Sequence, residues 1–396
     1  MPASRLKLLV TIIAALTVVM LFVLSLGRLR ETLGRTDKSQ GSPSSAALGS
    51  AKPPFVNQAS EVSKIRPEQV AEARALLQAA AAALRAQSSP DEARRILAEL
   101  RASLAALPKP VAFIAVVAFL DTKVDAPTGL EFSVGPGGFL TGATSLRVFL
   151  LDCMAALDPV AAGSYATKIL QIPTSPDEWA IGMRNYARAY PSPEGSAFLR
   201  QKAEDMIQNT AWRENPSGGF LEAFDVFVHT KDTVATPLLA KLVRNQDQPA
   251  TAHASYLTLD RLIIAEPQAV FAQIEKEPAL FKGRELMQAN FLARADVSKG
   301  NQRAQVERYL LDATRTPAEL AAFAGIYPNA NYMLSQNLLT STETPKHAEL
   351  IARDRIALKV TKEWLADPQF QRIYPHLQTI RNRLQIFVSQ TGEAPP

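Results

Sequence analysis

Residues 158–208 read DPVAAGSYATKILQIPTSPDEWAIGMRNYARAYPSPEGSAFLRQKAEDMIQ, and the fold class follows from this pattern. Asp158, Ser175 and Ser192 each stand directly before a proline, at two equal steps along the chain. An Asp or Ser side chain can accept a hydrogen bond from a free amide at a helix start. Proline fits the first helical position because the amide hydrogen that it lacks has no partner there. The stretch therefore predicts three consecutive short helices.

The same pairing of a capping or acidic residue with proline recurs towards the C-terminus. It is found at Thr236-Pro237, Glu266-Pro267, Thr316-Pro317, Thr344-Pro345 and Asp367-Pro368. Helix-like spacing of apolar residues follows each pair. The spacing of the later pairs is irregular, so no strict repeat is present. The two equal steps from Asp158 to Ser192 together match the length of a helix-hairpin repeat. From Pro67 to Gln390 the succession resembles degenerate HEAT-like helical hairpins. This resemblance is one of class, with no particular family matched, and it implies an α-solenoid.

Two amphipathic helices are predicted before this region. PEQVAEARALLQAAAAALRAQ, from Pro67, and DEARRILAELRASLAAL, from Asp91, each place apolar residues on one face. Ser88-Ser89-Pro90 between them stops one helix and starts the next, so the two form a hairpin. Val111 to Leu120 is apolar on all sides and too short to cross a bilayer. We expect it to be a buried central helix or strand.

Glycines interrupt the helical pattern between Ala126 and Thr144. Gly135, Gly137, Gly138 and Gly142 require unusual backbone angles or close backbone approach. A helix is predicted directly afterwards, over 145–157, and its free amides could hold an anion. The phosphate-loop pattern and the dinucleotide spacing are both absent. We interpret the stretch as a structural crossover loop, with a ligand site formed by the four glycines as the alternative.

The run LLVTIIAALTVVMLFVLSL, Leu8 to Leu26, predicts a membrane address. It is uncharged, and as a helix it matches the thickness of the hydrocarbon core. We expect a retained single-pass signal-anchor helix over 8–27. A cleaved signal sequence is the alternative, because Ser25 and Gly27 form a small-residue pattern before Arg28. A buried core helix is a third interpretation. The membrane is thus the first predicted partner.

Two rules disagree about the orientation of this anchor. Basic residues are more numerous after the run than before it, which favours a cytoplasmic body. A short basic start followed by a long folded part is instead the usual layout of a signal-anchor, and long domains cross largely regardless of charge. We expect the bulk of the chain to be extracytoplasmic, on the periplasmic side in a bacterium, with the cytoplasmic orientation left open.

Composition indicates an ordinary globular body. The chain has 396 residues, of which 47% are hydrophobic and 20% charged, enough for one or two domains. The net charge of +5 is partly due to the cluster that flanks the apolar run. With one cysteine, Cys153 in an apolar stretch, the chain can form no internal disulfide and no cysteine-based zinc site. We expect Cys153 to be a buried packing residue.

No reaction centre is predicted. The histidines His229, His253, His347 and His376 are far apart in sequence and have no metal-binding spacing, and no nucleophile elbow or carboxylate pair occurs. We therefore expect no catalytic residues, no metal and no cofactor. Asp225 and His229 are four residues apart on a predicted helix and could share a face. We interpret them as a solvated pair or a capped turn.

The last two predicted helices, over 345–390, are basic and contain aromatic residues. Such a surface can bind nucleic acid or anionic lipid. We expect instead the polar outer face of a terminal helix pair with its aromatic residues in the core, and we do not expect nucleic acid to be a partner. The aromatic residues are Trp364, Phe370, Tyr374 and Phe387.

The expected organisation is all-α after a membrane anchor. A short tail (1–7) precedes the transmembrane helix (8–27), and a flexible linker rich in Ser, Gly, Ala and Pro (28–62) leads to the α-helical repeat domain (63–390). Residues 391–396 are expected to be a disordered tail. The expected function is a membrane-tethered scaffold or adaptor that binds another protein in the cell envelope. The alternatives are an envelope enzyme or small-ligand binder that uses the glycine loop, and nucleic-acid or anionic-lipid binding by the basic helices.

Overall fold

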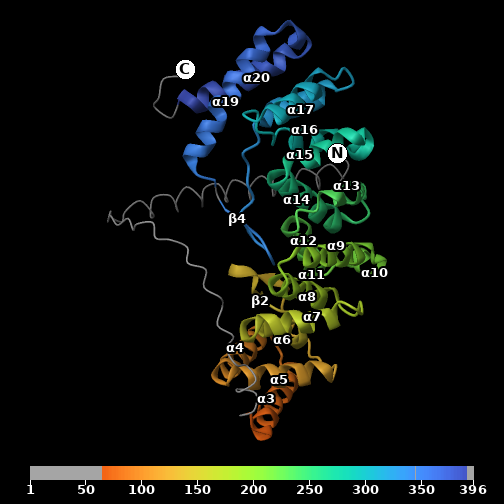
Figure 1. Cartoon of the computed structure of the whole chain (residues 1–396), viewed down its shortest axis with the longest axis vertical. Coiled ribbons are helices and arrows are strands. Elements are labelled where there is room, and N and C mark those ends of the chain that lie inside the picture. Colours follow the sequence, from red (N-terminus) through yellow and green to blue (C-terminus); the bar gives the residue numbers. More distant parts are fainter. Residues whose placement is uncertain (1–64, 344, 390–396) are drawn as a thin grey trace, which may run out of the picture. The chain divides into compact units, whose positions relative to one another are not determined.

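The computed structural model describes residues 65–343 and 345–389. The predicted anchor, linker and C-terminal tail lie outside the described residues. Within them the fold is all-α, as the sequence predicted, with two short β-hairpins (Figure 1). No helix in this part of the chain is long and apolar enough to span a bilayer.

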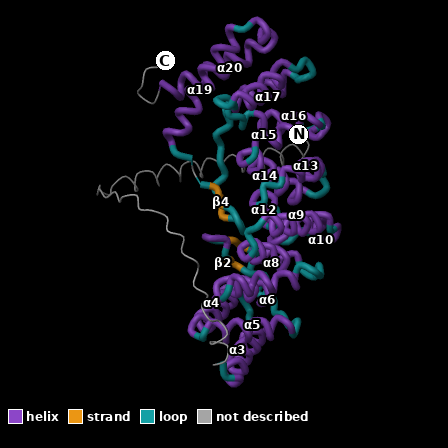
Figure 2. The backbone as a smooth tube through the Cα atoms, in the orientation of Figure 1, coloured by secondary structure: helices purple, strands orange, loops and turns teal. Residues whose placement is uncertain are grey.

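Helices follow one another along the described chain (Figure 2). The first group is α3 (Pro67–Ala86), α4 (Pro90–Ala106), α5 (Lys109–Asp121), α6 (Leu146–Leu157), α7 (Pro159–Ile169), α8 (Pro176–Ala189) and α9 (Pro193–Gln208). Short helices then follow: α10 (Thr210–Glu214), α11 (Gly218–Glu222) and α12 (Asp225–His229). The last group is α13 (Thr236–Arg244), α14 (Pro249–Ala265), α15 (Pro267–Lys276), α16 (Glu285–Leu292), α17 (Gly300–Leu311), α18 (Pro317–Ile326), α19 (His347–Ala366) and α20 (Tyr374–Ser389). Single 3-10 turns are η1 (Pro136–Gly138), η2 (Thr233–Ala235), η3 (Pro278–Phe281) and η4 (Pro368–Ile373).

Capping side chains start the helices of the central region. The oxygen of Asp158 accepts the amide of Ala161 at 3.0 Å, and the hydroxyl of Ser192 accepts the amide of Gly195 at 3.1 Å. Such bonds satisfy amides that have no partner inside the helix. Equivalent caps are made by Ser89, Ser175, Thr316 and Asp367.

Two of the predicted caps are wrong in detail. Glu266 precedes α15 but makes no capping hydrogen bond. Thr236 lies inside the first turn of α13, where its hydroxyl donates to the carbonyl of Thr233 at 2.7 Å. A 3-10 turn leads directly into α13, so the chain is already helical where a cap would require extended backbone. Thr344 lies outside the described residues.

Neighbouring helices supply most of the packing. α7 packs on α8, α13 on α14 and α19 on α20, while α3 contacts both α4 and α5. The apolar run Val111 to Leu120 forms most of α5, a helix, with six of its residues buried. All residues of α6 from Leu146 to Ala155 are buried as well. Two of these are charged, Arg147 and Asp152, so α6 brings ionic groups into the core.

The strands form two antiparallel hairpins. In the first hairpin β1 (Ser133–Val134) pairs with β2 (Leu140–Gly142), and η1 connects them. In the second hairpin β3 (Ser335–Gln336) pairs with β4 (Ser341–Thr342). The second hairpin was not predicted. The two hairpins, at residues 133–142 and 335–342, are far apart in sequence but meet where β3 contacts η1. Figure 1 shows β2 and β4 on the same side of the helices.

Candidate functional site

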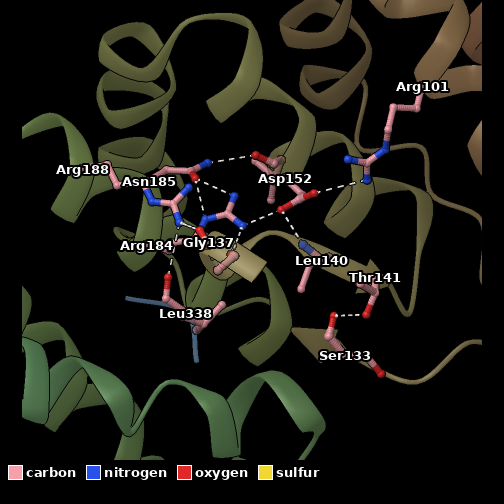
Figure 3. Close-up of polar contacts among 12 residues, drawn as sticks. Arg101, Ser133, Gly137, Leu140, Thr141, Asp152, Arg184, Asn185, Arg188 and Leu338 are labelled. Atoms are coloured by element: carbon pink, nitrogen blue, oxygen red, sulfur yellow. Dashed lines mark hydrogen bonds and ion pairs between the residues drawn. The ribbon is translucent and has the colours of Figure 1, made fainter. Parts of the chain in front are cut away.

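A buried ion pair lies behind the first hairpin (Figure 3). Asp152 of α6 and Arg184 of α8 are both fully buried and paired. The Nη1 atom of Arg184 also donates to the carbonyl of Gly138 at 2.8 Å. The other guanidinium nitrogens donate to Oδ1 of Asn185, whose amide donates to the carbonyl of Leu151. Each charge thus has a fixed set of partners, which a charge buried in protein requires.

Asp152 connects four elements. In addition to Arg184, its Oδ1 atom accepts the amide of Leu140 in β2 at 3.1 Å. Its Oδ2 atom lies 3.4 Å from Nη2 of Arg101 in α4. One carboxylate therefore holds α4, α6, α8 and the first hairpin together.

A second arginine joins the two hairpins. Arg188 of α8 donates to the carbonyl of Gly137 and lies 3.5 Å from the carbonyl of Leu338 in the second hairpin (Figure 3). The ring of Phe139 lies 4.6 Å from the guanidinium carbon of Arg188 and 5.2 Å from that of Arg184. Burial and the neighbouring Arg184 charge lower the pKa of Arg188 to about 10.

The predicted ligand loop is packed against other parts of the chain. Gly137 and Gly138 have φ angles of 67° and 72°, which favour glycine. A Cβ on Gly138 would lie 2.1 Å from the carbonyl oxygen of Leu338, so the second hairpin approaches too closely for any side chain there. Gly135 and Gly142 are also crowded, because a Cβ on either residue would lie 2.5 Å from an atom in or beside the first hairpin.

The amides at the start of α6 also have partners. Leu146 donates its amide to the carbonyl of Ala126 at 2.9 Å, and Arg147 donates to the carboxylate of Asp125 at 3.0 Å. Ser145 caps the helix by accepting the amide of Val148. The groups expected to be available for an anion are thus used by the chain itself. A cleft of about 250 Å³ lies beside the loop, lined in part by Arg94, Arg101, Thr141 and Gly142.

Asp225 of α12 anchors the second hairpin. This carboxylate is 3% exposed and accepts the amides of Leu339 at 2.6 Å and Thr340 at 2.9 Å, as well as the Thr340 hydroxyl. It also pairs with Arg261 of α14, at 2.6 Å. Leu338, at the tip of the hairpin, is fully buried. The interpretation of Asp225 as half of a solvated pair with His229 was therefore wrong, because its partners are Arg261 and the hairpin.

Cysteine, histidine and acidic side chains do not gather into a candidate metal site anywhere in the described residues. Cys153 is buried, as predicted, and burial raises the pKa of its thiol to about 12. A thiol with such a pKa stays protonated near neutral pH. These features give no chemical role to Cys153 beyond packing.

Arginines of the C-terminal helices are bound to backbone carbonyls. Arg353 donates to the carbonyl of Arg294 at 2.6 Å, Arg372 donates to that of Asp312 at 2.8 Å, and Arg383 donates to two carbonyls near the end of α18. The aromatic residues divide. Trp364 and Phe370 are in the core, whereas Tyr374 and Phe387 are about half exposed.

Sequence reasoning found the glycines but missed the ionic residues of this site. A signal was present, since Asp152 is the single acid of the apolar stretch LRVFLLDCMAAL, and Asp225 is one of two acids in the apolar stretch FLEAFDVFVH. A buried acid requires a partner, but the partners Arg184 and Thr340 are distant in sequence. No protein-family model, curated protein or solved structure matches this chain.

Proposed function

We propose that this chain is a membrane-tethered α-solenoid scaffold that binds another protein in the cell envelope. The apolar run from Leu8 to Leu26 is the basis for the tether. An extracytoplasmic body is part of the proposal. The single observation that carries the scaffold role is the succession of helices that pack mainly on their neighbours in sequence. Repeated helical units of this kind create extended binding surfaces.

The junction of the two hairpins supports a role in presenting a surface. The carboxylates of Asp152 and Asp225 are occupied by arginines and backbone amides, so they hold the hairpins in place. Met333 and Leu334 lie between two fixed points of the chain, Asn329 and the tip of the second hairpin. The backbone amide of Asn329 donates to the carbonyl of Ala293 at 2.7 Å. The side chains of Met333 and Leu334 are 56% and 62% exposed. Contiguous exposed apolar surface marks protein contact sites, and we infer that Met333 and Leu334 belong to such a surface.

Site-specific crosslinking in native membranes tests this proposal. A photo-reactive residue at Leu334 is expected to yield one protein adduct, which mass spectrometry identifies. The same residue at the exposed Lys282, in a turn outside both hairpins, is the matched control. A reporter fused at Pro396 gives the orientation of the body. Equal adduct patterns at both positions, or no protein adduct at Leu334, contradict partner binding at this segment.

A second candidate function rests on the cleft of about 250 Å³ beside the glycine loop. Arg94 and Arg101 of α4 line it, paired with Asp91 and with the buried Asp152 respectively, and their remaining guanidinium N–H groups suit a small anion. Inorganic phosphate is a suitable probe. We expect Arg101→Gln to abolish phosphate binding if the cleft is the functional site, and an unchanged phosphate affinity in this variant argues for the scaffold alone.

A further inference from the structure

A second, larger cavity lies far along the chain from the glycine loop. It has a volume of about 320 Å³ and lies between α15, η3, α16 and α17. Phe271, Ile274 and Leu292 give it apolar walls. This volume and this mainly apolar lining are typical of small-molecule sites.

Two buried glutamines also line this cavity. Gln288 of α16 is 5% exposed and Gln305 of α17 is 6% exposed. The Oε1 atom of Gln305 is buried and has no hydrogen-bond partner within the described chain. Gln302, about one turn earlier on α17, is comparably buried, but its Oε1 accepts the amide of Asp296 at 2.7 Å. A buried amide oxygen without a partner destabilises the fold, so Gln305 requires an explanation that Gln302 does not.

The charged groups around the cavity form ion pairs, although the buried Nε atom of Arg315 has no hydrogen-bond partner within the described chain. Arg308 pairs with Glu275 at 2.7 Å, and both side chains are substantially exposed, which places them at the mouth. Arg315 pairs with Asp312 at 2.9 Å and with the buried Glu319 at 3.1 Å. Three carboxylates therefore surround two guanidinium groups. A further negative charge is disfavoured by this balance, which points to an uncharged ligand.

We propose that this cavity binds a small uncharged molecule that carries an amide beside an apolar group. The ligand amide donates its N–H to Oε1 of Gln305, and its carbonyl accepts from a glutamine side-chain amide. The apolar group packs against Phe271, Ile274 and Leu292. Such a ligand is either a free small molecule or a peptide segment of another protein, and the site is independent of the scaffold surface at the second hairpin.

Probe binding to the full-length chain, purified in a mild detergent, tests the ligand class. N-acetyl-leucinamide is expected to bind with a Kd on the order of a millimolar, given its small size, and to raise the Tm. N-acetyl-leucine has the same shape but carries a carboxylate, and it is expected to bind at least about tenfold more weakly. A longer blocked peptide, acetyl-Ala-Leu-Ala-amide, distinguishes the sources. Binding of this peptide indicates a protein segment, and its exclusion indicates a free small molecule.

Methionine substitutions separate a ligand role from a structural one. Gln305→Met keeps the side-chain length but removes the unpartnered amide oxygen, so it is expected to raise the Tm of the unliganded protein and to weaken N-acetyl-leucinamide binding at least about tenfold. Gln302→Met is the matched control, expected to lower the Tm because the Asp296 amide loses its acceptor, and to retain binding. The proposal is overturned by absence of N-acetyl-leucinamide binding to the wild type, by a lower Tm for Gln305→Met, or by undiminished binding to that variant.

Discussion

Replacing Asp225 by alanine should release the second hairpin from the helices. The carboxylate is 3% exposed and accepts hydrogen bonds from the amides of Leu339 and Thr340 and from the Thr340 hydroxyl, besides its ion pair with Arg261. Hydrogen bonds to a charged group contribute about 1.5–3 kcal/mol each. Their simple sum overstates the loss, because the released amides regain hydrogen bonds to water.

The size of the effect follows from the surroundings of Arg261. Breaking a buried ion pair costs about 3–5 kcal/mol when the remaining charge stays buried. The Arg261 side chain is 18% exposed and can regain water, so the lower end applies, about 3 kcal/mol. Every 1.4 kcal/mol is a factor of ten in an equilibrium constant. The opening equilibrium of the hairpin should therefore increase by about 100-fold.

Amide hydrogen exchange measures this opening directly. Exchange at the Leu339 amide should accelerate by about 100-fold in Asp225→Ala. Asp260→Ala is the matched control, because Asp260 is on the same helix as Arg261 and pairs with Arg294 at 2.7 Å without touching the hairpin. Its exchange at Leu339 should equal that of the wild type. If both variants leave this amide equally protected, the carboxylate of Asp225 does not hold the hairpin and the reasoning fails.

Three further predictions concern the glycine loop, pH and the helix caps. Gly138→Ala should lower the Tm much more than Gly137→Ala, because both residues have a positive φ but only at Gly138 would the new Cβ meet backbone, at 2.1 Å. Burial and the nearby Asp225 charge raise the pKa of Glu222 to about 7. The stability that protonated Glu222 contributes is present below its ordinary pKa of 4.5 and is lost as the pH rises through about 7. Glu222→Gln should therefore flatten the pH dependence of the free energy of unfolding between pH 4.5 and 7, measured by urea denaturation, and an unchanged pH profile contradicts this. Ser175→Ala should cost about 1 kcal/mol in the free energy of unfolding, measured by urea denaturation. Glu266→Ala, at a helix start without a capping bond, should cost less, because it removes only a partly exposed ion pair with Lys231.

Local chemistry made the helices predictable. Ser175 and Ser192 cap helices because a short polar side chain before a proline satisfies the amides of the first turn, which depends only on nearby residues. The helix at Val111 to Leu120, six of whose residues are buried, follows in the same way from an apolar run too short to cross a bilayer. These features need no knowledge of which helices pack together.

The glycine loop was predictable only in part. Its glycines indicated unusual backbone angles, which the positive φ angles of Gly137 and Gly138 confirm. What lies against the loop was not predictable, because Arg184 and Leu338 come from segments that carry no local sign of contact with it. The proposal of a ligand at these glycines remains a prediction, now tied to the cleft at Arg101.

The chain's own residues thus determined the all-α class and most of the helix starts, because capping and periodicity act over one or two turns of helix. The membrane address rests on hydropathy alone and stays a prediction. Only the tertiary structure decided that Asp152 binds Arg184, that Asp225 holds a hairpin from residues 335–342, and that the Gln305 amide faces a cavity. The two carboxylates depend on partners brought close by folding, and the cavity at Gln305 depends on how α15, η3, α16 and α17 pack. A charged or amide group that is buried on folding loses its hydrogen bonds to water. Its hydrogen-bond partner is then whichever group the packed helices place beside it.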